Sequence, residues 1–231
     1  MKNESIHQGY LDKETEYFGR IRDDIFPLLP ENIGRVLEIG CGTGDTLNYL
    51  KQHGRCDWAG GVELIASAAE VARKRLDSVV EGNIEDITLP FEEGSFDAIL
   101  CLDVLEHLVD PWRVVGELER FLKPGGVMVA SIPNVRHFRG LLPLLFQGRW
   151  TYSREGILDK THLRFFTRES AIALMESSGM RADLVRATGV GWGSKSWFAN
   201  VLTLFIFRPF LEVQYLIRVR KAGYPDSVRK V

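Results

Sequence analysis

The segment VLEIGCGTG, residues 36–44, restricts the possible folds of this chain more than any other part of the sequence. An apolar run typical of a buried β-strand leads into three glycines spaced two apart, and a helical pattern follows at once. Glycine is needed where a turn has a positive φ or where backbone approaches a ligand closely, because a Cβ atom would block that approach. The order strand, glycine loop, helix predicts the first unit of an α/β domain with a ligand at the loop; a plain turn is the alternative.

Strand-like apolar runs alternate with helical patterns through residues 35–132, which predicts βαβ units in a mostly parallel sheet. The predicted strands are residues 35–39, 58–63, 78–82, 96–101 and 127–132, followed by closing strands at 182–187 and 214–221. The predicted helices are residues 46–53, 64–76, one that begins at Pro111 and is stopped by residues 123–126, and one after Thr167, its N-cap.

A chain of 231 residues fits one large domain. We expect residues 1–34 to form an N-terminal helical cap and residues 35–231 to form the main domain. Residues 134–166 interrupt the alternation with a mixture of aromatic, basic and histidine residues. Long irregular insertions tend to be functional, so we expect this insertion on the substrate side.

Composition excludes some classes of partner. The formal net charge of −2 supplies no overall field for a phosphate backbone, which argues against nucleic acid. Three cysteines without pairing or metal-ligand spacing are typical of a reducing compartment. The polar stretch at the start of the chain lacks the apolar region of a secretory signal, so we expect a cytoplasmic protein.

Glu38 indicates which ligand the glycine loop binds. The fingerprint of a nicotinamide dinucleotide site is G-x-G-x-x-G, whereas this loop reads G-x-G-x-G. A carboxylate two residues before the first glycine repels a pyrophosphate but accepts hydrogen bonds from an ammonium group. The loop therefore favours a ligand with a cationic amino-acid part.

These residues resemble those of class I S-adenosylmethionine-dependent methyltransferases, and the resemblance covers roughly residues 30–190. It implies a Rossmann-like, seven-stranded, mostly parallel sheet with helices on both faces and an antiparallel last strand. It also implies that Glu38, Gly40 and Gly42, and Gly44 as a weaker candidate, lie against the methionine part of S-adenosylmethionine. Glu63, 19 residues after Gly44, would accept both ribose hydroxyls, or else be a solvated glutamate at a strand end.

Two further segments extend the resemblance. EGNIED, residues 81–86, resembles the adenine-binding turn of the family, with Ile84 against the ring and Asn83 at a position that usually holds aspartate. Residues 89–111 resemble the stretch around the fourth strand, where Cys101 and Leu102 would flank the cofactor.

His107 is the first candidate for a general base, because histidine changes its charge near neutral pH. Its alternative role is a hydrogen bond within the turn after the fourth strand. Asp103, Glu106 and His107 have i, i+3, i+4 spacing, which on a helical turn would aim all three groups the same way. Some quinone-biosynthesis O-methyltransferases have a similar pattern associated with metal; we expect no metal here.

His162 is the second candidate. It lies in GILDKTHLRFFT, residues 156–167, which resembles a segment of bacterial methyltransferases often associated with surface polysaccharide or glycolipid pathways. With Asp159 and Arg164 it would line an acceptor pocket, or all three would form a polar brace under a lid. His137 is a third possibility, for which a solvated basic loop is the favoured interpretation.

The apolar segments 141–146 and 201–207 have arginines nearby. We expect them to pack beside the last two strands, and contact with a membrane surface or a lipid-linked acceptor is the alternative. The longer apolar stretch 197–211 is too short to span a bilayer.

The sequence thus predicts methyl transfer from S-adenosylmethionine to an oxygen or nitrogen atom of a small-molecule, sugar or lipid-linked acceptor. A catalytically silent member that binds only the cofactor or a partner is the alternative, followed by a nicotinamide-dependent oxidoreductase. A nucleic-acid methyltransferase is disfavoured, because CLDVLEH stands where amino-directed DNA enzymes have an Asn-Pro-Pro-Tyr type of motif.

Overall fold

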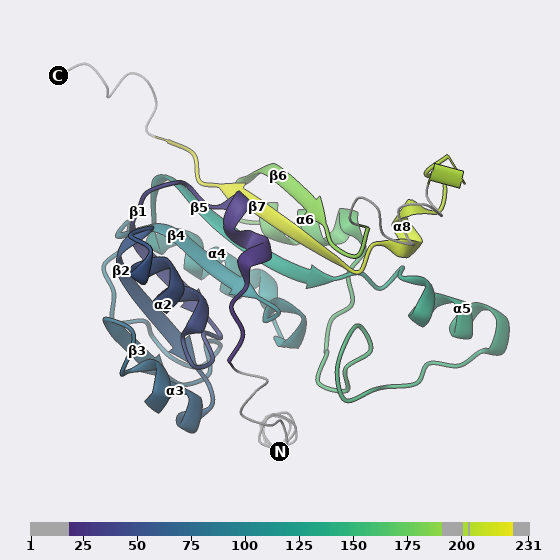
Figure 1. Ribbon diagram of the computed structural model, residues 1–231, viewed down its shortest axis with the longest axis horizontal. Helices are drawn as coiled ribbons and strands as arrows, with labels where there is room; N and C mark the ends of the chain where they lie inside the picture. The colour runs from purple at the N-terminus through teal and green to yellow at the C-terminus, as the bar shows by residue number, and fades with distance from the viewer. Residues whose placement is uncertain (1–18, 191–200, 203, 224–231) are drawn as a thin grey trace.

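The computed structural model describes residues 19–190, 201–202 and 204–223, which form a seven-stranded sheet in the order β3-β2-β1-β4-β5-β7-β6 (Figure 1). The strands are β1 (Ile33–Ile39), β2 (Cys56–Glu63), β3 (Ser78–Glu81), β4 (Phe96–Leu102), β5 (Leu122–Pro133), β6 (Arg181–Ala187) and β7 (Gln214–Arg220). Neighbouring strands from β3 to β5 pair in parallel, whereas β7 is antiparallel to both β5 and β6. The predicted Rossmann-like sheet with an antiparallel last strand is confirmed.

Helices cover both faces of the sheet. They are α2 (Asp45–Gln52), α3 (Ala66–Ala72), α4 (Pro111–Phe121), α5 (Phe138–Gln147), α6 (Arg168–Glu176) and α8 (Arg208–Leu211), with the 3-10 turns η2 (Asp23–Leu28) and η3 (Leu105–His107). Successive strand residues point to opposite faces. Val36 therefore packs with Leu47 of α2 and Ile25 of η2, while Leu37 belongs to the cluster under α4 and α6.

Several predicted boundaries need correction. The segment 123–126 does not separate a helix from a strand, because β5 already begins at Leu122. The helix predicted at 64–76 is shorter, and α3 ends at Ala72. The prediction of Thr167 as an N-cap is confirmed, since its side chain accepts a hydrogen bond from Ser170 N. Of the predicted cap, residues 1–18 lie outside the described residues, and 33–34 already belong to β1.

The two apolar segments do not pack beside the last strands as expected. Leu145 and Phe146 of α5 are 66% and 77% exposed, and Leu204 is 80% exposed. Both segments project at the end of the molecule opposite to α3 (Figure 1). Among the described residues, no helix has the length and apolar character needed to cross a membrane.

Candidate functional site

A cavity of about 800 Å³ lies where β1, β2 and β4 end, a size typical of small-molecule sites, which enclose about 300–1,000 Å³. The strand order changes direction between β1 and β4, and open α/β sheets bind their ligands at such a point. Six of the seven predicted cofactor residues line this cavity together with His107: Glu38, Gly40, Gly42, Glu63, Asn83 and Ile84.

The glycine loop, residues 40–44, holds its backbone against the cavity. Gly40 and Gly42 have φ values of 69° and 55°, a conformation that side chains disfavour. A Cβ atom on Gly40 would also lie 2.6 Å from Cγ2 of Val104. The amides of Gly40 and Cys41 both donate to the carbonyl oxygen of Val62, at 2.8 and 3.1 Å, so the loop is fixed to β2. Gly44 does not line the cavity; a Cβ there would meet Leu76.

Glu63 fixes the loop from the other side. Its Oε2 accepts from the amide of Gly42 and its Oε1 from the amide of Ile65, both at 2.8 Å. Burial raises the pKa of this carboxyl, and the backbone hydrogen bonds oppose the rise. Each carboxylate oxygen has a second lone pair, so Glu63 can also accept hydroxyl groups from a ligand.

Glu38 is a buried carboxyl, one oxygen of which has no hydrogen bond to any described residue. It is 4% exposed, and the oxygen without a partner is Oε2. Burial raises its pKa to about 8; Arg22 opposes this rise, while Glu63 and Asp45 add to it. A cationic group in the cavity would supply the missing hydrogen bond and compensate the buried charge.

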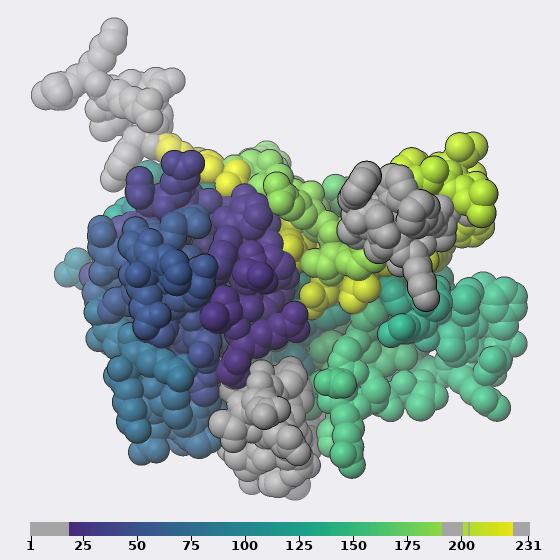
Figure 2. All heavy atoms as spheres, in the orientation of Figure 1, coloured from purple at the N-terminus to yellow at the C-terminus, as the bar shows by residue number. Residues whose placement is uncertain are grey.

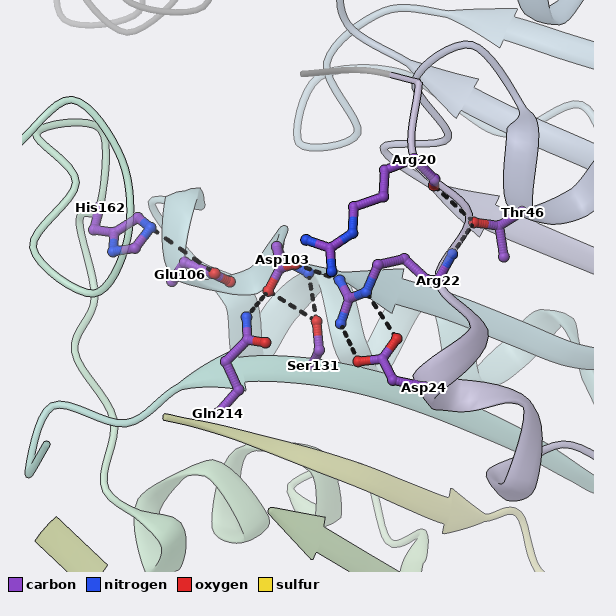
Figure 3. A network of polar contacts seen from close by, with 9 residues as sticks. All are labelled: Arg20, Arg22, Asp24, Thr46, Asp103, Glu106, Ser131, His162 and Gln214. Atoms are coloured by element: carbon purple, nitrogen blue, oxygen red, sulfur yellow. Dashed lines mark hydrogen bonds and ion pairs between the residues drawn. The ribbon is translucent and has the colours of Figure 1, made fainter. Parts of the chain in front are cut away.

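Arg20 and Arg22, which the sequence analysis missed, bring positive charge to the same cavity. Arg22 forms ion pairs with Asp24 and with Asp103 at the end of β4 (Figure 3). Arg20 makes no side-chain ion pair with any other described residue; its carbonyl accepts from Thr46. Two arginines in an otherwise mixed stretch give no sequence signal by themselves, because only the fold brings residues 19–24 over the glycine loop.

Asp103 does not point the same way as Glu106 and His107, which corrects the prediction from their spacing. Asp103 has a φ of 57° and lies before η3, so no helical turn joins the three residues. Its carboxylate accepts from Arg22, from Ser131 Oγ and from Gln214 Nε2 (Figure 3).

The sequence predicted that Asp103 would lie beside Glu106 and His107. In the structure His162 lies beside them instead. The centres of the two imidazole rings are 4.6 Å apart, and His162 Nε2 lies 3.9 Å from Glu106 Oε1. Nδ1 of His107 lies 3.1 Å from the carbonyl oxygen of Thr161, and the amides of Leu163 and Arg164 donate to the carbonyl of Glu106. Only His107 of this pair lines the cavity; His162 lies behind it.

Glu106, His107 and His162 offer ligand atoms that all lie within 4.8 Å of one another, so they could hold a divalent ion. Both carboxyl oxygens of Glu106 lack a hydrogen-bond partner among the described residues. Burial raises the pKa of Glu106 well above its usual range, with Asp103 adding to the rise, which favours a neutral carboxyl. The expectation that the protein uses no metal stays a prediction.

Three other candidate residues, Cys101, Asn83 and His137, have surroundings that the sequence did not predict. Cys101 is fully buried in the core and does not line the cavity, whereas its neighbour Leu102 does. The amide of Asn83 closes a turn, accepting from Glu85 N and donating to Asp86. His137 is not solvated: it is buried and caps α5, accepting from the amide of Arg139.

Asp159 and Arg164 belong to the brace rather than to the cavity wall. Asp159 Oδ1 accepts from the amide and the hydroxyl of Thr161, at 2.8 and 2.7 Å, which shapes the turn beside His162. Arg164 donates to the carbonyl oxygen of Val109 and does not itself line the cavity.

The part of the chain that contains most of the cavity-lining loops is similar to known proteins. Residues 37–130 match a family model described as a methyltransferase domain. The chain is 31% identical over 134 residues to 27-O-demethylrifamycin SV methyltransferase of Amycolatopsis mediterranei, covering 53% of this chain and 49% of that protein. It is 34% identical over 146 residues to ubiquinone biosynthesis O-methyltransferase of Pseudomonas aeruginosa, covering 58% and 61%. The chain therefore matches only about half to three fifths of the length of these relatives.

A solved structure extends the similarity to nearly the whole chain. It is an S-adenosylmethionine-dependent methyltransferase of Thermotoga maritima, described as a possible histamine N-methyltransferase, with a TM-score of 0.58 and 27% identity over 94% of this chain and 91% of that one. The match to the methyltransferase domain begins in β1 and ends in β5, so it includes the glycine loop, Glu63 and His107. Residues 37–130 therefore form a methyltransferase domain, and the chain as a whole is similar in fold to an S-adenosylmethionine-dependent methyltransferase.

Proposed function

We propose that this protein binds S-adenosylmethionine in the cavity and transfers its methyl group to an oxygen or nitrogen atom of a small-molecule, sugar or lipid-linked acceptor. The observation that carries this proposal is the convergence of Glu38, Glu63, the glycine loop and His107 on one cavity. Relatives named for methylation of a rifamycin and in ubiquinone biosynthesis favour an oxygen acceptor, and the Thermotoga maritima structure keeps a nitrogen acceptor open.

The residues of the cavity fit the parts of this cofactor. Glu38 has an unpartnered oxygen for the ammonium group, and Arg20 lines the same cavity with a guanidinium suited to the carboxylate. Glu63 keeps lone pairs for the ribose hydroxyls, and Ile84 offers an apolar surface for the adenine ring. The unpartnered oxygen of Glu38 disfavours a nicotinamide dinucleotide, because a pyrophosphate has no hydrogen-bond donor for an ionised carboxylate.

Bound S-adenosylmethionine supplies an electrophilic methyl group on a sulfonium, so positioning of the acceptor and exclusion of water provide most of the acceleration. A hydroxyl acceptor must also lose its proton. His107 is suited to take it, because the carbonyl of Thr161 can only accept a hydrogen bond. Nδ1 of His107 therefore carries the hydrogen, and Nε2 is the basic nitrogen.

His162 serves as a positioning residue for His107 in this proposal. Its ring contacts that of His107 edge to face, and its own Nδ1 is held 3.0 Å from the carbonyl oxygen of Ile157. The insertion thereby fixes the orientation of the base, while the sheet fixes the cofactor. The prediction that both histidines are catalytic is thus refined: His107 acts on the acceptor and His162 acts through His107.

Calorimetric titration of the full chain with S-adenosylmethionine, S-adenosylhomocysteine and NADH tests the proposal. We expect micromolar binding of the two sulfur compounds and no binding of NADH. A following screen with radiolabelled methyl donor against phenolic, sugar and lipid-linked acceptors would separate an active enzyme from a silent binding protein. Binding of NADH alone, or of none of the three, would overturn the assignment of the cavity.

A further inference from the structure

Two apolar segments are exposed at one end of the molecule, and we refer to them together as the apolar edge. It consists of the exposed apolar side chains of α5 and of residues 201–202 and 204–207. Phe146 is 77% exposed, Leu202 is 87% exposed and Leu204 is 80% exposed. Water-soluble surfaces rarely keep so many large apolar side chains together, and such patches mark interaction sites.

The two segments are fixed relative to each other at their bases. Nδ2 of Asn134, just before α5, donates to the carbonyl oxygens of Pro209 and Glu212, at 2.8 and 2.7 Å. The guanidinium of Arg136 lies 5.0 Å from the ring centre of Phe210. From these bases the segments extend away from the sheet, at the end opposite to α3 (Figures 1 and 2). The apolar edge is therefore a defined surface of the fold.

α5 does not have the pattern of a helix that packs on its own domain. Within it only Gly140 is buried, and the exposed side chains of Leu142, Leu145 and Phe146, at i, i+3 and i+4, share one face. Ten residues of α-helix are about 15 Å long, far short of the ~30 Å hydrocarbon core of a bilayer. A helix of this kind fits the interfacial layer of a membrane, in which apolar side chains are covered without spanning.

The charges around the apolar edge complement an anionic surface. Residues 134–154 contain four arginines, at positions 136, 139, 149 and 154, and no aspartate or glutamate. Arg139 and Arg149, at the two ends of α5, are exposed. Residues 201–207 carry no charge, and Arg208 follows them. Arginines beside exposed apolar side chains attract anionic lipid headgroups.

We propose that the apolar edge docks on a bilayer that contains anionic lipid. The positive charge of the arginines beside the apolar edge favours an anionic partner. The separation of the two apolar segments favours a deformable lipid layer over a second protein surface. The same chain segment continues from α5 to Thr161 and His162, which lie against His107. Docking would bring the acceptor side of the cavity close to lipid-linked acceptors, a consequence that rests on the proposed function.

Flotation of the full chain with lipid vesicles tests this proposal. We expect co-flotation with vesicles of phosphatidylcholine and phosphatidylglycerol, a decrease of the floated fraction as salt is raised, and no flotation with phosphatidylcholine alone. The double variant Phe146→Glu, Leu202→Glu should lose flotation. Trp112→Glu on α4 is the matched control, because this aromatic is 47% exposed but lies outside the apolar edge, and it should float like the wild type.

Thermal unfolding without lipid should show that all these variants are folded, since the substituted side chains are exposed. The proposal fails if the wild type does not float with anionic vesicles, or if the double variant floats as well as the wild type. It also fails if sedimentation shows a dimer that Phe146→Glu dissociates, because a second copy would then cover the edge. Flotation requires no methyl transfer, and calorimetry with S-adenosylmethionine tests the proposed function separately.

Discussion

The proposed cofactor side and the proposed acceptor side of this protein are held in place by different kinds of contact. On the cofactor side, Glu38 and Glu63 lie within β1 and β2, Gly42 lies in the loop after β1, and that loop is hydrogen-bonded to β2. On the acceptor side, His107 and His162 come from segments 55 residues apart and meet through backbone carbonyls of an insertion. The sheet therefore fixes the cofactor site, whereas the acceptor site can change with the insertion alone.

The two sides also differ in the surroundings of their buried carboxyl groups. Glu38 and Glu63 line the cavity, where a ligand can compensate them, and Glu63 already accepts two backbone hydrogen bonds. Glu106 lies beside His162 and does not line the cavity. The first pair fits the proposed binding of a cofactor, and Glu106 fits the surroundings of the proposed base.

Substitution of His107 should have the largest effect, and it should lower turnover without weakening cofactor binding. His107→Ala is expected to lower kcat with a hydroxyl acceptor by about 10²–10⁴-fold, the range for loss of a general base. Affinity for S-adenosylmethionine should change less than about threefold, because the proposed cofactor contacts are made by other residues. Steady-state kinetics and calorimetry on the same sample measure both quantities.

His162→Ala is the companion variant for the acceptor side. As a positioning residue it should lower kcat on the order of tenfold and broaden or shift the pH profile of kcat, with cofactor affinity unchanged. A purely structural role would lower thermal stability and leave the pH profile unchanged. Full activity of both histidine variants would remove the acceptor-side assignment altogether.

Gly40→Ala should weaken cofactor binding by distorting the glycine loop. A Cβ there meets Val104 at 2.6 Å and forces a φ of 69° on alanine, so the glycine loop must shift. We expect affinity for S-adenosylhomocysteine to fall about a hundredfold, which corresponds to about 2.7 kcal/mol. Gly94→Ala is the matched control, because Gly94 has a φ of 64° with no atom within 4 Å of the added Cβ. It should cost about 1–2 kcal/mol of stability and leave affinity intact; an equal loss of affinity in both variants would contradict the loop assignment.

The features on the cofactor side could be predicted from the sequence more fully than those that depend on distant segments. The strands, the glycine loop, Glu63 and Ile84 were predictable, because they depend on hydrophobic periodicity and on neighbours in sequence. Arg20 and Arg22 could not be assigned, since their place depends on how residues 19–28 cross the sheet end. The exposure of α5 was predicted wrongly, because an apolar pattern alone indicates burial and does not identify the surface that covers it. Cys101 and Leu102 differ by one residue, and only the strand register decides which of them faces the cavity.

The cofactor side should also show a pH dependence that the acceptor side does not share. Burial raises the pKa of Glu38 to about 8, so this carboxyl is mainly protonated at neutral pH and must ionise to bind an ammonium group. Binding should therefore release a proton, and affinity should weaken by up to about tenfold for each pH unit below 8. Calorimetry in buffers of different ionisation enthalpy measures the released proton.

Glu38→Gln is the control for this pH dependence. It should abolish proton release while weakening cofactor affinity at pH 8. Because the pKa of Glu38 is raised from 4.5, its ionisation destabilises the fold as pH rises from 4.5 to about 8. Glu38→Gln should therefore gain thermal stability relative to the wild type at pH 8 but not at pH 4. Proton release that persists in this variant would assign the titrating group elsewhere.

Cys101→Ala should produce the smallest change and tests the register of β4. Cys101 is fully buried in the core, with its neighbour Leu102 on the cavity wall. We expect Cys101→Ala to lower the free energy of unfolding by about 1 kcal/mol through lost packing, with cofactor affinity unchanged. Leu102→Ala, one residue further along, should weaken cofactor affinity several-fold because it removes part of the cavity wall. If Cys101→Ala weakened binding more than Leu102→Ala, the cofactor would contact the opposite face of β4, and the cavity described above would not be its binding site.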